Sequence, residues 1–323
     1  MPLQVPLLSI CIPTYSRCDL LRQGLQAIAQ QMTEIPLGQV EIIVSDNASS
    51  DETSQIIERF NLESPEICLH YFRQPENIGA TRNVCFVAQA ATGDFVYILS
   101  DDDILLPGSL KKIVSVIQAH PDLDAVCPGV SAFTAFPEKI KSLKCLQEDD
   151  LVMDRNQVLM RLGTMLTFIS SVVFRKNAIR AAHANNDALF PHSFIFLAAI
   201  AREKGCLFLS QECLAPRGNE SIGYDLIQAF VTDFVAVLQF AEKIGYSRNA
   251  TQNVLSAHAG WVAGFLRLFR KTSYRPNLQK RIRDTAKVTG VWWRNPQALL
   301  RIEAAMWLPD VIYNPIKEIL RRC

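Results

Sequence analysis

The sequence of 323 residues predicts an α/β fold, with a doubly wound, mostly parallel β-sheet and a helical C-terminal appendage. Three observations predict it. Short apolar runs alternate with segments of helical periodicity through the first 130 residues, polar clusters directly follow the apolar runs, and only helical periodicity is found after about residue 225. Strands that alternate with helices at this spacing are typical of parallel sheets.

The first two strand and helix pairs show the pattern most clearly. Residues 7–13 are an apolar run that ends at a proline, and Asp19 is positioned to cap the helix that follows. Residues 40–46 form a second apolar run, and Ser49 and Glu52 have the spacing of a capping box ahead of the next helix.

The later elements follow in the same order. We expect strands at residues 69–72, 95–99 and 124–127 and helices at residues 80–91 and 110–119. The chain is less regular beyond residue 130, where we expect a strand at residues 168–174 and a helix at residues 193–203. The last expected helices are at residues 226–244, 253–269, 278–287 and 297–306.

Charge is distributed unevenly along the chain. Residues 267–323 carry 13 Lys or Arg and 4 Asp or Glu, a balance of +9, whereas residues 1–266 carry 20 and 28, a balance of −8. A basic segment on an acidic body indicates an anionic surface or partner for that segment. The acidic body, with no recognisable DNA- or RNA-binding motif, argues against nucleic acid.

The cysteines and the apolar segments bear on the cellular location. The nine cysteines include no C-x-x-C pair, so we expect buried reduced thiols rather than a disulfide framework or a zinc site. The sequence contains no run of about 18 uncharged apolar residues, so no membrane-spanning helix is predicted. The N-terminal segment lacks the basic region of a signal peptide, and we therefore expect a cytoplasmic protein.

Three adjacent carboxylates follow a predicted core strand in the stretch YILSDDDILLP at residues 97–107. Neighbouring carboxylates close to a core raise one another's pKa or destabilise the fold. A bound divalent cation such as Mg²⁺ or Mn²⁺ removes that cost. Asp101, Asp102 and Asp103 are therefore candidates for a metal site, and a solvated acidic turn ahead of the next helix is the alternative.

Other polar clusters follow the first two strands. Residues 13–17, PTYSR, offer a rigid turn, hydroxyl groups, an aromatic ring and a cation, and Asp46 ends the second strand. Ligands of such sheets bind beyond the carboxyl ends of the strands, where Asp46 would accept a hydrogen bond from a base or ribose or else form an Asx-turn. Arg82 lies in the first turn of a helix, where the helix dipole prefers an anion; it faces a phosphate or carboxylates, or it is an ordinary exposed arginine.

Taken in order, these motifs resemble the family 2 glycosyltransferases of the GT-A fold. The segments that carry the resemblance are IPTYSR at residues 12–17, VSDNASSDET at 44–53, NIGATRN at 77–83 and SDDD at 100–103. The resemblance is strongest over residues 7–110 and extends to about residue 220. Within the family, the chain is most similar to bacterial O-antigen and capsule sugar transferases, including the abequosyltransferase-like branch.

The resemblance implies a domain organisation and a donor site. Residues 1–222 would form the GT-A domain, with a nucleotide-binding half at 1–110 and an acceptor half at 111–222, and residues 223–323 a helical region that is basic from about 267. The residues implied for nucleotide-sugar binding are Pro13, Thr14, Tyr15, Arg17, Asp46, Asn77, Arg82, Asp101 and Arg217. Arg217 would meet the diphosphate, or it is an exposed loop cation.

The metal motif of the family matches with one departure. The usual first aspartate of D-x-D falls on Ser100, so Asp102 is the matching ligand for Mn²⁺ or Mg²⁺. Asp103 is expected to help to hold the metal, and Asp101 is the other carboxylate that could compensate for Ser100.

The catalytic base has no obvious match. In inverting members, a carboxylate pair at the start of a later helix deprotonates the acceptor hydroxyl, but the matching segment here, ALFPHSFIF at residues 188–196, contains no such pair. His192 is the candidate base, because its ordinary pKa of about 6.5 suits proton transfer near neutral pH. Asp187 is the rival base, and a structural histidine that caps the helix is the alternative.

We therefore expect an inverting, metal-dependent transferase that moves a sugar from a nucleotide-diphosphate donor to a hydroxyl of a cell-surface glycan. A non-catalytic nucleotide-sugar-binding homologue and a sugar-phosphate nucleotidyltransferase are the rival classes; the second would normally carry a glycine-rich phosphate loop, which residues 13–17 do not.

The acceptor is expected to be a glycan, carried on a polyprenyl diphosphate. Aromatic and basic residues alternate in the C-terminal part, for example at residues 261–271 and 291–294. They suit peripheral attachment to the anionic inner face of the plasma membrane, or else the interior of a helical bundle.

Overall fold

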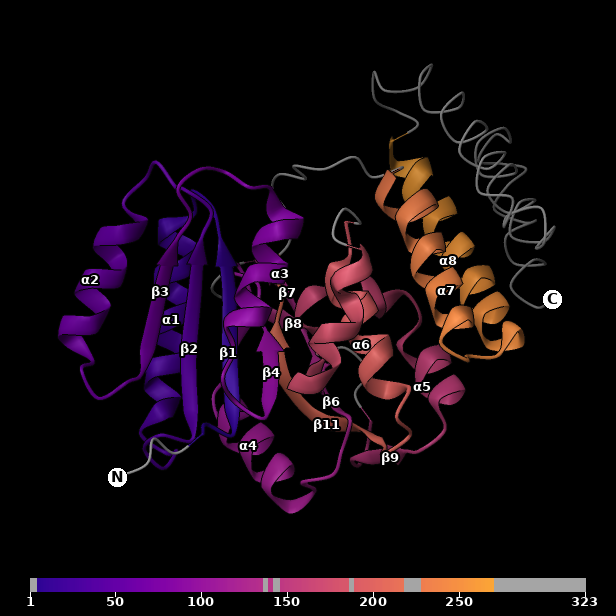
Figure 1. Ribbon diagram of the computed structural model, residues 1–323, viewed down its shortest axis with the longest axis horizontal. Coiled ribbons are helices and arrows are strands. Elements are labelled where there is room, and N and C mark those ends of the chain that lie inside the picture. The colour runs from indigo at the N-terminus through magenta and orange to yellow at the C-terminus, as the bar shows by residue number, and fades with distance from the viewer. Residues whose placement is uncertain (1–4, 136–138, 142–145, 186–188, 218–227, 270–323) are drawn as a thin grey trace. The chain divides into compact units, whose positions relative to one another are not determined.

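The computed structural model describes residues 5–135, 139–141, 146–185, 189–217 and 228–269 (Figure 1). The chain divides into two compact units, one of Met1–Val158 with Leu166–Ser221 and one of Leu159–Met165 with Ile222–Cys323. The expected domain boundary at residue 222 lies outside the described residues and stays a prediction.

Nine strands among the described residues form one sheet in the first unit. Its order is β3-β2-β1-β4-β10-β6-β11-β5, and β9 pairs with β11. The strands are β1 Leu8–Thr14, β2 Val40–Asp46, β3 Leu69–Arg73, β4 Phe95–Ile98, β5 Ile104–Leu105, β6 Ala125–Val130, β9 Asp150–Val152, β10 Val173–Arg175 and β11 Cys206–Ala215. The strands from β3 to β4 are parallel neighbours, and β6 is parallel to β11. The predicted α/β fold with a mostly parallel sheet is confirmed.

Helices cover both faces of this sheet (Figure 1). On one face α1 contacts α2 and α4, and on the other α3 contacts α6. Their bounds are α1 Cys18–Met32, α2 Thr53–Glu63, α3 Ala80–Ala90, α4 Ser109–Ala119 and α6 Pro191–Ile200. All seven residues of β2 are buried, because a parallel strand covered on both faces is in contact with apolar side chains on both sides. This is why such strands are continuous apolar runs in the sequence.

Short elements complete the described chain. In a separate two-stranded sheet, β7 Ala132–Ala135 pairs antiparallel with β8 Lys139–Lys141, and α5 spans Arg155–Leu162. Three short helices follow: η1 Gly163–Thr167, which runs from the second unit into the first, and η2 Ile169–Ser171 and η3 Lys176–Asn185, both in the first.

The strand expected at residues 168–174 is wrong in its first half. Residues Ile169–Ser171 form a short 3₁₀ helix, and β10 begins only at Val173. The hydroxyl of Ser170 accepts a hydrogen bond from the Ser100 amide, and its carbonyl accepts one from the Tyr97 hydroxyl. These contacts to the strand β4 region hold the backbone away from a regular ladder.

The two expected helix caps are also wrong. The N-cap positions of α1 and α2 are Arg17 and Glu52, and neither side chain makes a capping hydrogen bond. Asp51 provides the bond expected of Asp19, because its Oδ2 accepts from the Cys18 amide at 2.9 Å. A side chain from a different loop therefore stabilises the start of α1, which local spacing does not predict.

A buried carboxylate joins three segments at the amino ends of the parallel strands. Glu41 Oε1 on β2 accepts hydrogen bonds from the Ser9 hydroxyl at 2.5 Å and from the Thr92 amide at 2.7 Å. It is only 1 % exposed. A Cβ on Gly93 would lie 2.8 Å from Ser9 Oγ, so this turn has no room for a side chain.

The described part of the second unit is built on two helices. The expected helix at residues 226–244 is a π-helix over Gln228–Asp233 followed by α7 Phe234–Lys243, and α8 spans Arg248–Phe269. No helix within the described residues is both long and apolar enough to cross a bilayer. The helices expected at residues 278–287 and 297–306 lie outside the described residues.

A buried histidine links these helices. The ring of His258 on α8 stacks on Phe234 with a centroid distance of 3.9 Å. Its Nε2 donates to the Phe230 carbonyl in the π-helix at 2.8 Å, and its Nδ1 lies 3.5 Å from Thr164 Oγ1. Burial lowers the pKa of His258 to about 4, so the imidazole is neutral at pH 7.

We expect the second unit to lose stability as the pH falls from about 6.5 toward 4. Unfolded His258 regains an ordinary pKa of about 6.5, so below that pH the unfolded state binds a proton that the folded state does not, which favours unfolding. All four tryptophans lie between residues 261 and 307, so their fluorescence follows this unit during urea unfolding. The urea concentration at the unfolding midpoint should be lower at pH 5 than at pH 7.

The matched variant is His258→Gln, whose amide can still donate to the Phe230 carbonyl. It should lose less stability than the wild type over the same pH interval. Equal losses in the two proteins would show that another group causes the acid sensitivity.

Candidate active site

The acidic triplet follows β4 directly, and its members are largely buried. Asp101 is 5 % and Asp103 3 % exposed, while the Asp102 side chain is 17 % exposed. Each carboxylate accepts a short hydrogen bond from a hydroxyl group: Asp101 from Thr14 at 2.7 Å, Asp102 from Ser100 at 2.6 Å and Asp103 from Ser170 at 2.6 Å. The triplet is therefore not the solvated turn that was the alternative.

Arg17 is the cation that the triplet contacts. Its Nη1 lies 3.1 Å from an Asp101 oxygen and 3.2 Å from an Asp102 oxygen. Because β1 and β4 are parallel neighbours, the loop after β1 lies beside the loop after β4. Thr14 and Arg17 therefore reach the carboxylates from the adjacent strand end.

Burial has a strong effect on the charge of the triplet. It raises the pKa of Asp101 to about 6, although Arg17 and Thr14 act in the opposite direction. It raises the pKa of Asp103 to about 8, with a further contribution from the Asp102 charge. At neutral pH the protein does not hold three full negative charges here, which reduces the repulsion that the sequence implies.

Asp46 ends β2 and is fully buried. Its Oδ1 accepts from the Ser49 amide at 2.8 Å, and its Oδ2 accepts from the Tyr71 hydroxyl at 2.7 Å. Arg73 lies 3.7 Å from Oδ2 and is half exposed. Burial and the Asp46 carboxylate raise the pKa of Tyr71 to about 12, so the phenol stays a donor. Asp46 thus forms the Asx-type turn and carries a polar network above it.

Two asparagines order the loop before α3. Asn47 Nδ2 donates to Asn77 Oδ1 at 2.9 Å, and Asn47 Oδ1 accepts from the Ile78 amide at 2.9 Å. Gly79 then precedes α3 with a φ of 85°, a backbone conformation that favours glycine. Arg82 follows in the first turn of the helix and is exposed, on the side where the dipole is positive.

Arg217, just beyond β11, also reaches this site. Its Nη2 donates to Gln23 Oε1 on α1 at 2.8 Å, and its backbone amide donates to Asp103. The predicted residues Thr14, Arg17, Asp101, Asp102 and Arg217 are thus brought together. Pro13 and Tyr15 flank Thr14, and Tyr15 is 48 % exposed.

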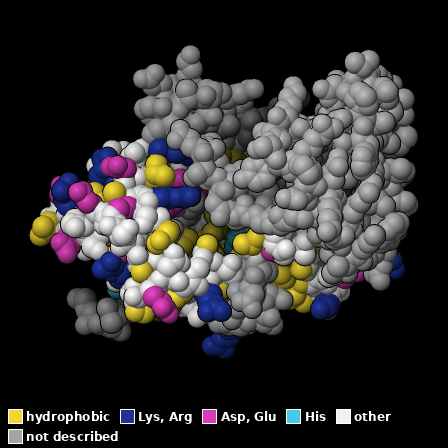
Figure 2. Space-filling view, turned by 90° about the horizontal axis from the view of Figure 1, so that it is seen from above, with side chains coloured by type: hydrophobic (Ala, Val, Ile, Leu, Met, Phe, Trp, Pro, Cys, Tyr) yellow, Lys and Arg dark blue, Asp and Glu magenta, His cyan; other side chains and the backbone are white. Residues whose placement is uncertain are grey.

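Figure 2 views the molecule from above, onto the end at which the parallel strands of Figure 1 finish. On the coloured part of this face, Lys and Arg side chains lie beside Asp and Glu side chains. Within the site itself, Arg17 beside Asp101 and Asp102 offers a cation for phosphate groups together with carboxylates.

His192 lies in the first turn of α6 and is 4 % exposed. Its ring lies between Phe190 and Phe196, with centroid distances of 5.9 and 5.5 Å. Among the described residues, neither ring nitrogen makes a hydrogen bond of regular geometry. Burial lowers the pKa of His192 to about 4, although the nearby Thr167 and Leu166 backbone acts in the opposite direction. The helix has Phe190 as its N-cap and no side-chain capping bond, so His192 does not cap it. Its rival Asp187 lies outside the described residues.

Sequence reasoning missed three residues that hold the site together. Asn83 on α3 donates to the Ser45 carbonyl and accepts from the Ser45 hydroxyl, and its amide lies 3.5 Å from the Thr14 carbonyl. Its position within the NIGATRN segment was the available signal. Tyr71 and Ser170 had no local signal, because their partners Asp46 and Asp103 are 25 and 67 residues away.

The loops after β1 and β2 each contain a residue with a left-handed backbone. Ser16 has a φ of 49° and Ala48 a φ of 62°. The Ser16 amide donates to Ser49 Oγ at 2.8 Å, which ties the two loops together. Strained backbone of this kind is concentrated at ligand sites, and here it flanks the residues implied for donor binding.

Comparison with known proteins identifies related sequences. The family described as Glycosyl transferase family 2 matches residues 9–177. Abequosyltransferase RfbV of Salmonella typhimurium is 29 % identical over 279 residues, which cover 79 % of this chain and 82 % of that protein. The GalNAc(5)-diNAcBac-PP-undecaprenol beta-1,3-glucosyltransferase of Campylobacter jejuni is 35 % identical over 111 residues, but these are only 34 % of each chain.

Solved structures show the same fold at lower identity. TarS 1–349 of S. aureus in complex with UDP-GlcNAc aligns with a TM-score of 0.64 at 15 % identity, covering 98 % of this chain and 91 % of that one. The mannosyltransferase PcManGT of Pyrobaculum calidifontis, in complex with GDP-Man and Mn²⁺, aligns with a TM-score of 0.55 at 17 % identity, covering 90 % and 88 %. Both likenesses establish the GT-A fold of the chain.

We expect Ala48→Gly to raise the free energy of unfolding of the first unit by up to about 1 kcal/mol, because glycine adopts the left-handed conformation without steric cost. Ala48→Val should lower it by about 1–2 kcal/mol, because a β-branched side chain fits this conformation poorly. The measurement is urea unfolding followed by far-ultraviolet circular dichroism.

The control for this prediction is Ala29→Gly within α1, where the same substitution should destabilise by about 0.5–1 kcal/mol. If Ala48→Gly destabilises as Ala29→Gly does, the left-handed backbone at residue 48 is wrong.

Proposed function

The chain belongs to glycosyl transferase family 2, and from this premise we propose that it transfers a sugar from a nucleoside-diphosphate donor to a hydroxyl of a bacterial cell-surface glycan, with inversion at the anomeric carbon. The observation that carries the proposal is the convergence of Thr14 and Arg17 with Asp101 and Asp102 at the carboxyl ends of two adjacent parallel strands. Such strand ends are where α/β proteins bind nucleotides.

The donor would be held by residues of three strand ends. Pro13, Thr14 and Tyr15 would line the nucleotide, with the exposed Tyr15 ring available for stacking. Asp46 and the neighbouring Asn77 would hold the base or ribose. Because Asp46 is buried, it would do so indirectly, by ordering the loop that contacts the nucleotide. Arg82, Arg217 and Arg17 would meet the diphosphate, because guanidinium groups bind phosphate oxygens in a bidentate manner.

A divalent metal fits the donor set at the triplet. Two carboxylate oxygens, one from Asp101 and one from Asp102, face the same cationic nitrogen of Arg17. Mg²⁺ and Mn²⁺ bind through one or two carboxylates together with substrate phosphates. Asp102, the most accessible of the three, would be the principal ligand, with Asp101 beside it; the part expected of Asp103 stays a prediction.

When bound, the metal would neutralise charge on the departing diphosphate. No cluster of three candidate ligand side chains occurs within the described ranges, so the donor phosphates and water would complete the coordination. Arg17 would move from the carboxylates toward the phosphates as the metal binds, because both cations use the same oxygens.

The acceptor would be activated from the side of α6. His192 is neutral at pH 7, so its ring can accept a proton from the attacking hydroxyl, although a pKa of about 4 makes it a weaker base than an ordinary histidine. Its burial between Phe190 and Phe196 requires that the acceptor displace neighbouring groups to reach it. Asp187 would be the base if the proton is taken from outside this pocket.

The acceptor class follows the relatives. An abequosyltransferase and a glucosyltransferase named for an undecaprenol-linked acceptor are among them. We propose an acceptor carried on a polyprenyl diphosphate, reached at the inner face of the plasma membrane. The basic residues from 267 onward would contact the anionic surface.

Replacement of Asp102 by asparagine should remove metal-dependent donor binding. The substitution keeps the shape but loses the charge that a cation needs, so affinity for a nucleotide sugar in Mn²⁺ should fall to the level measured in EDTA. Isothermal titration of UDP-, GDP-, CDP- and dTDP-sugars, with Mn²⁺ or with EDTA, measures this. A selective wild-type response also establishes the donor class, and release or transfer of its sugar distinguishes an enzyme from a binding protein.

The matched control for this experiment is Asp122→Asn on the exposed surface before β6, which should behave as the wild type. Equal Mn²⁺ dependence in the wild type and in Asp102→Asn would place the metal elsewhere.

The His192→Gln variant should lower turnover while leaving donor affinity unchanged. General-base catalysis contributes about 10²–10⁴-fold, so kcat should fall within that range and the dissociation constant of the donor should stay within about twofold. His70→Gln, at an exposed position of β3, is the matched control. Because His192 is buried, thermal unfolding must first show that the variant is folded; near-normal turnover would move the base to Asp187.

A further inference from the structure

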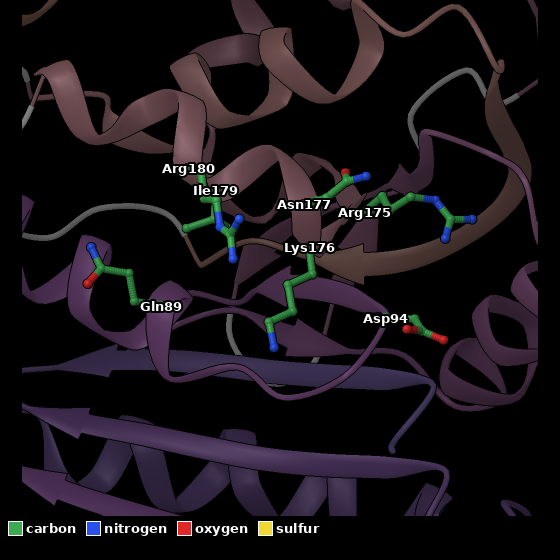
Figure 3. A pocket seen from close by; sticks show the side chains of 7 residues that line it. All are labelled: Gln89, Asp94, Arg175, Lys176, Asn177, Ile179 and Arg180. Atoms are coloured by element: carbon green, nitrogen blue, oxygen red, sulfur yellow. The ribbon is translucent and has the colours of Figure 1, made fainter. Parts of the chain in front are cut away.

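A cavity lies on the first unit, away from the triplet. It has a volume of about 600 Å³ and is bordered by η3, by the end of α3 and by the turn that precedes β4 (Figure 3). The residues that line it are Gln89, Asp94, Arg175, Lys176, Asn177, Ile179 and Arg180. Its size is that of pockets which hold small molecules.

Three of the lining side chains are cations. Figure 3 shows Lys176 and Arg180 pointing into the space between η3 and α3. Arg175 is fixed in place: Nε donates to the Leu123 carbonyl at 3.0 Å, a second nitrogen donates to the Pro121 carbonyl, and the guanidinium lies 4.5 Å from the centre of the Phe95 ring. The cavity therefore contains a cation that is already ordered.

The other two cations have little to neutralise them. Lys176 Nζ has one long hydrogen bond, to the Thr92 carbonyl at 3.4 Å. Within the described ranges, neither Lys176 nor Arg180 forms an ion pair. The single carboxylate of the lining, Asp94, lies on the side of Lys176 away from Arg180. The cavity thus has an excess of positive charge on the η3 side.

This distribution favours one kind of ligand. Lys and Arg side chains that converge on one space are typical of phosphate sites, and the Gln89 and Asn177 amides border the same space. Asp94 would repel an anion that filled the whole cavity but can accept hydrogen bonds from hydroxyl groups. We propose that this cavity binds a phosphate-bearing ligand, with the phosphate between Lys176 and Arg180 and its uncharged, hydroxyl-bearing part toward Asp94.

The cavity is distinct from the donor site. Asp94 immediately precedes β4, whereas Ser100 to Asp103 follow it. The four residues of β4 span roughly 13 Å at about 3.3 Å per residue. The cavity and the triplet therefore lie at opposite ends of β4.

The test compares the wild type with the double variant Lys176→Glu/Arg180→Glu. Inorganic pyrophosphate, titrated calorimetrically in EDTA, probes a soluble ligand. Co-sedimentation with phosphatidylcholine vesicles that contain phosphatidylglycerol probes a lipid headgroup. We expect binding in at least one assay to weaken by at least about tenfold in the double variant, because two attractive charges become repulsive.

Two controls make the result specific. The Lys111→Glu/Arg59→Glu variant makes the same change in net charge as the test variant, but at exposed positions of α4 and α2. It should bind as the wild type does. Arg17→Ala should lose any pyrophosphate binding at the donor site but keep the part that Lys176→Glu/Arg180→Glu loses, which assigns that part to this cavity. If the double variant fails to fold, Lys176→Gln/Arg180→Gln takes its place and should weaken binding in the same direction.

The outcomes separate the sources of the phosphate. Loss of pyrophosphate binding alone identifies a soluble ligand, and loss of vesicle binding identifies a lipid headgroup. The proposal is overturned if the wild type binds neither probe, or if the double variant and the Lys111→Glu/Arg59→Glu control behave alike in both assays.

Discussion

The contact between the end of β1 and the carboxylates after β4 is the interaction on which the first unit depends. Buried carboxylates are costly unless hydrogen-bonded or paired, and Asp101 obtains both from Thr14 and Arg17. These two residues are in reach only because β1 and β4 are parallel neighbours. The same pairing therefore stabilises the fold and gathers the groups that we propose for nucleotide-sugar binding.

The elements that could be predicted from the sequence are those whose cause is local. The apolar runs of β1, β2 and β4 predict strands, because parallel strands are buried on both faces. The run at residues 168–174 looks the same, but Ser170 binds the loop after β4 and bends the chain. Period and propensity carry no information on such a distant partner, so the strand was predicted too long.

The residues of the candidate site could be predicted from the sequence, but the contacts between them could not. The order of the motifs indicated Thr14, Arg17, Asp46 and the triplet, yet not which groups neutralise which. Tyr71 and Ser170 belong to the site only through contacts across 25 and 67 residues. The depth of His192 was equally hidden, because its apolar neighbours in the sequence indicate dry surroundings but do not reveal that the residue is only 4 % exposed, with its ring between Phe190 and Phe196. Sequence spacing fixes which strand end a residue follows; tertiary packing decides its charge.

At the amino ends of the parallel strands, the hydrogen bonds of Glu41 with Ser9 and Thr92 limit which substitutions the chain can accept. Replacement of Glu41 would leave the Ser9 hydroxyl and the Thr92 amide without this acceptor. Any side chain at residue 93 would collide with Ser9. We therefore expect substitutions at Ser9, Glu41, Thr92 and Gly93 to be tolerated only in combination, so that these four residues change as one block. Because the block has no part in the loops after β1, β2 and β4, a descendant enzyme could acquire a new sugar preference by exchanging those loops and inherit the rest of its scaffold intact.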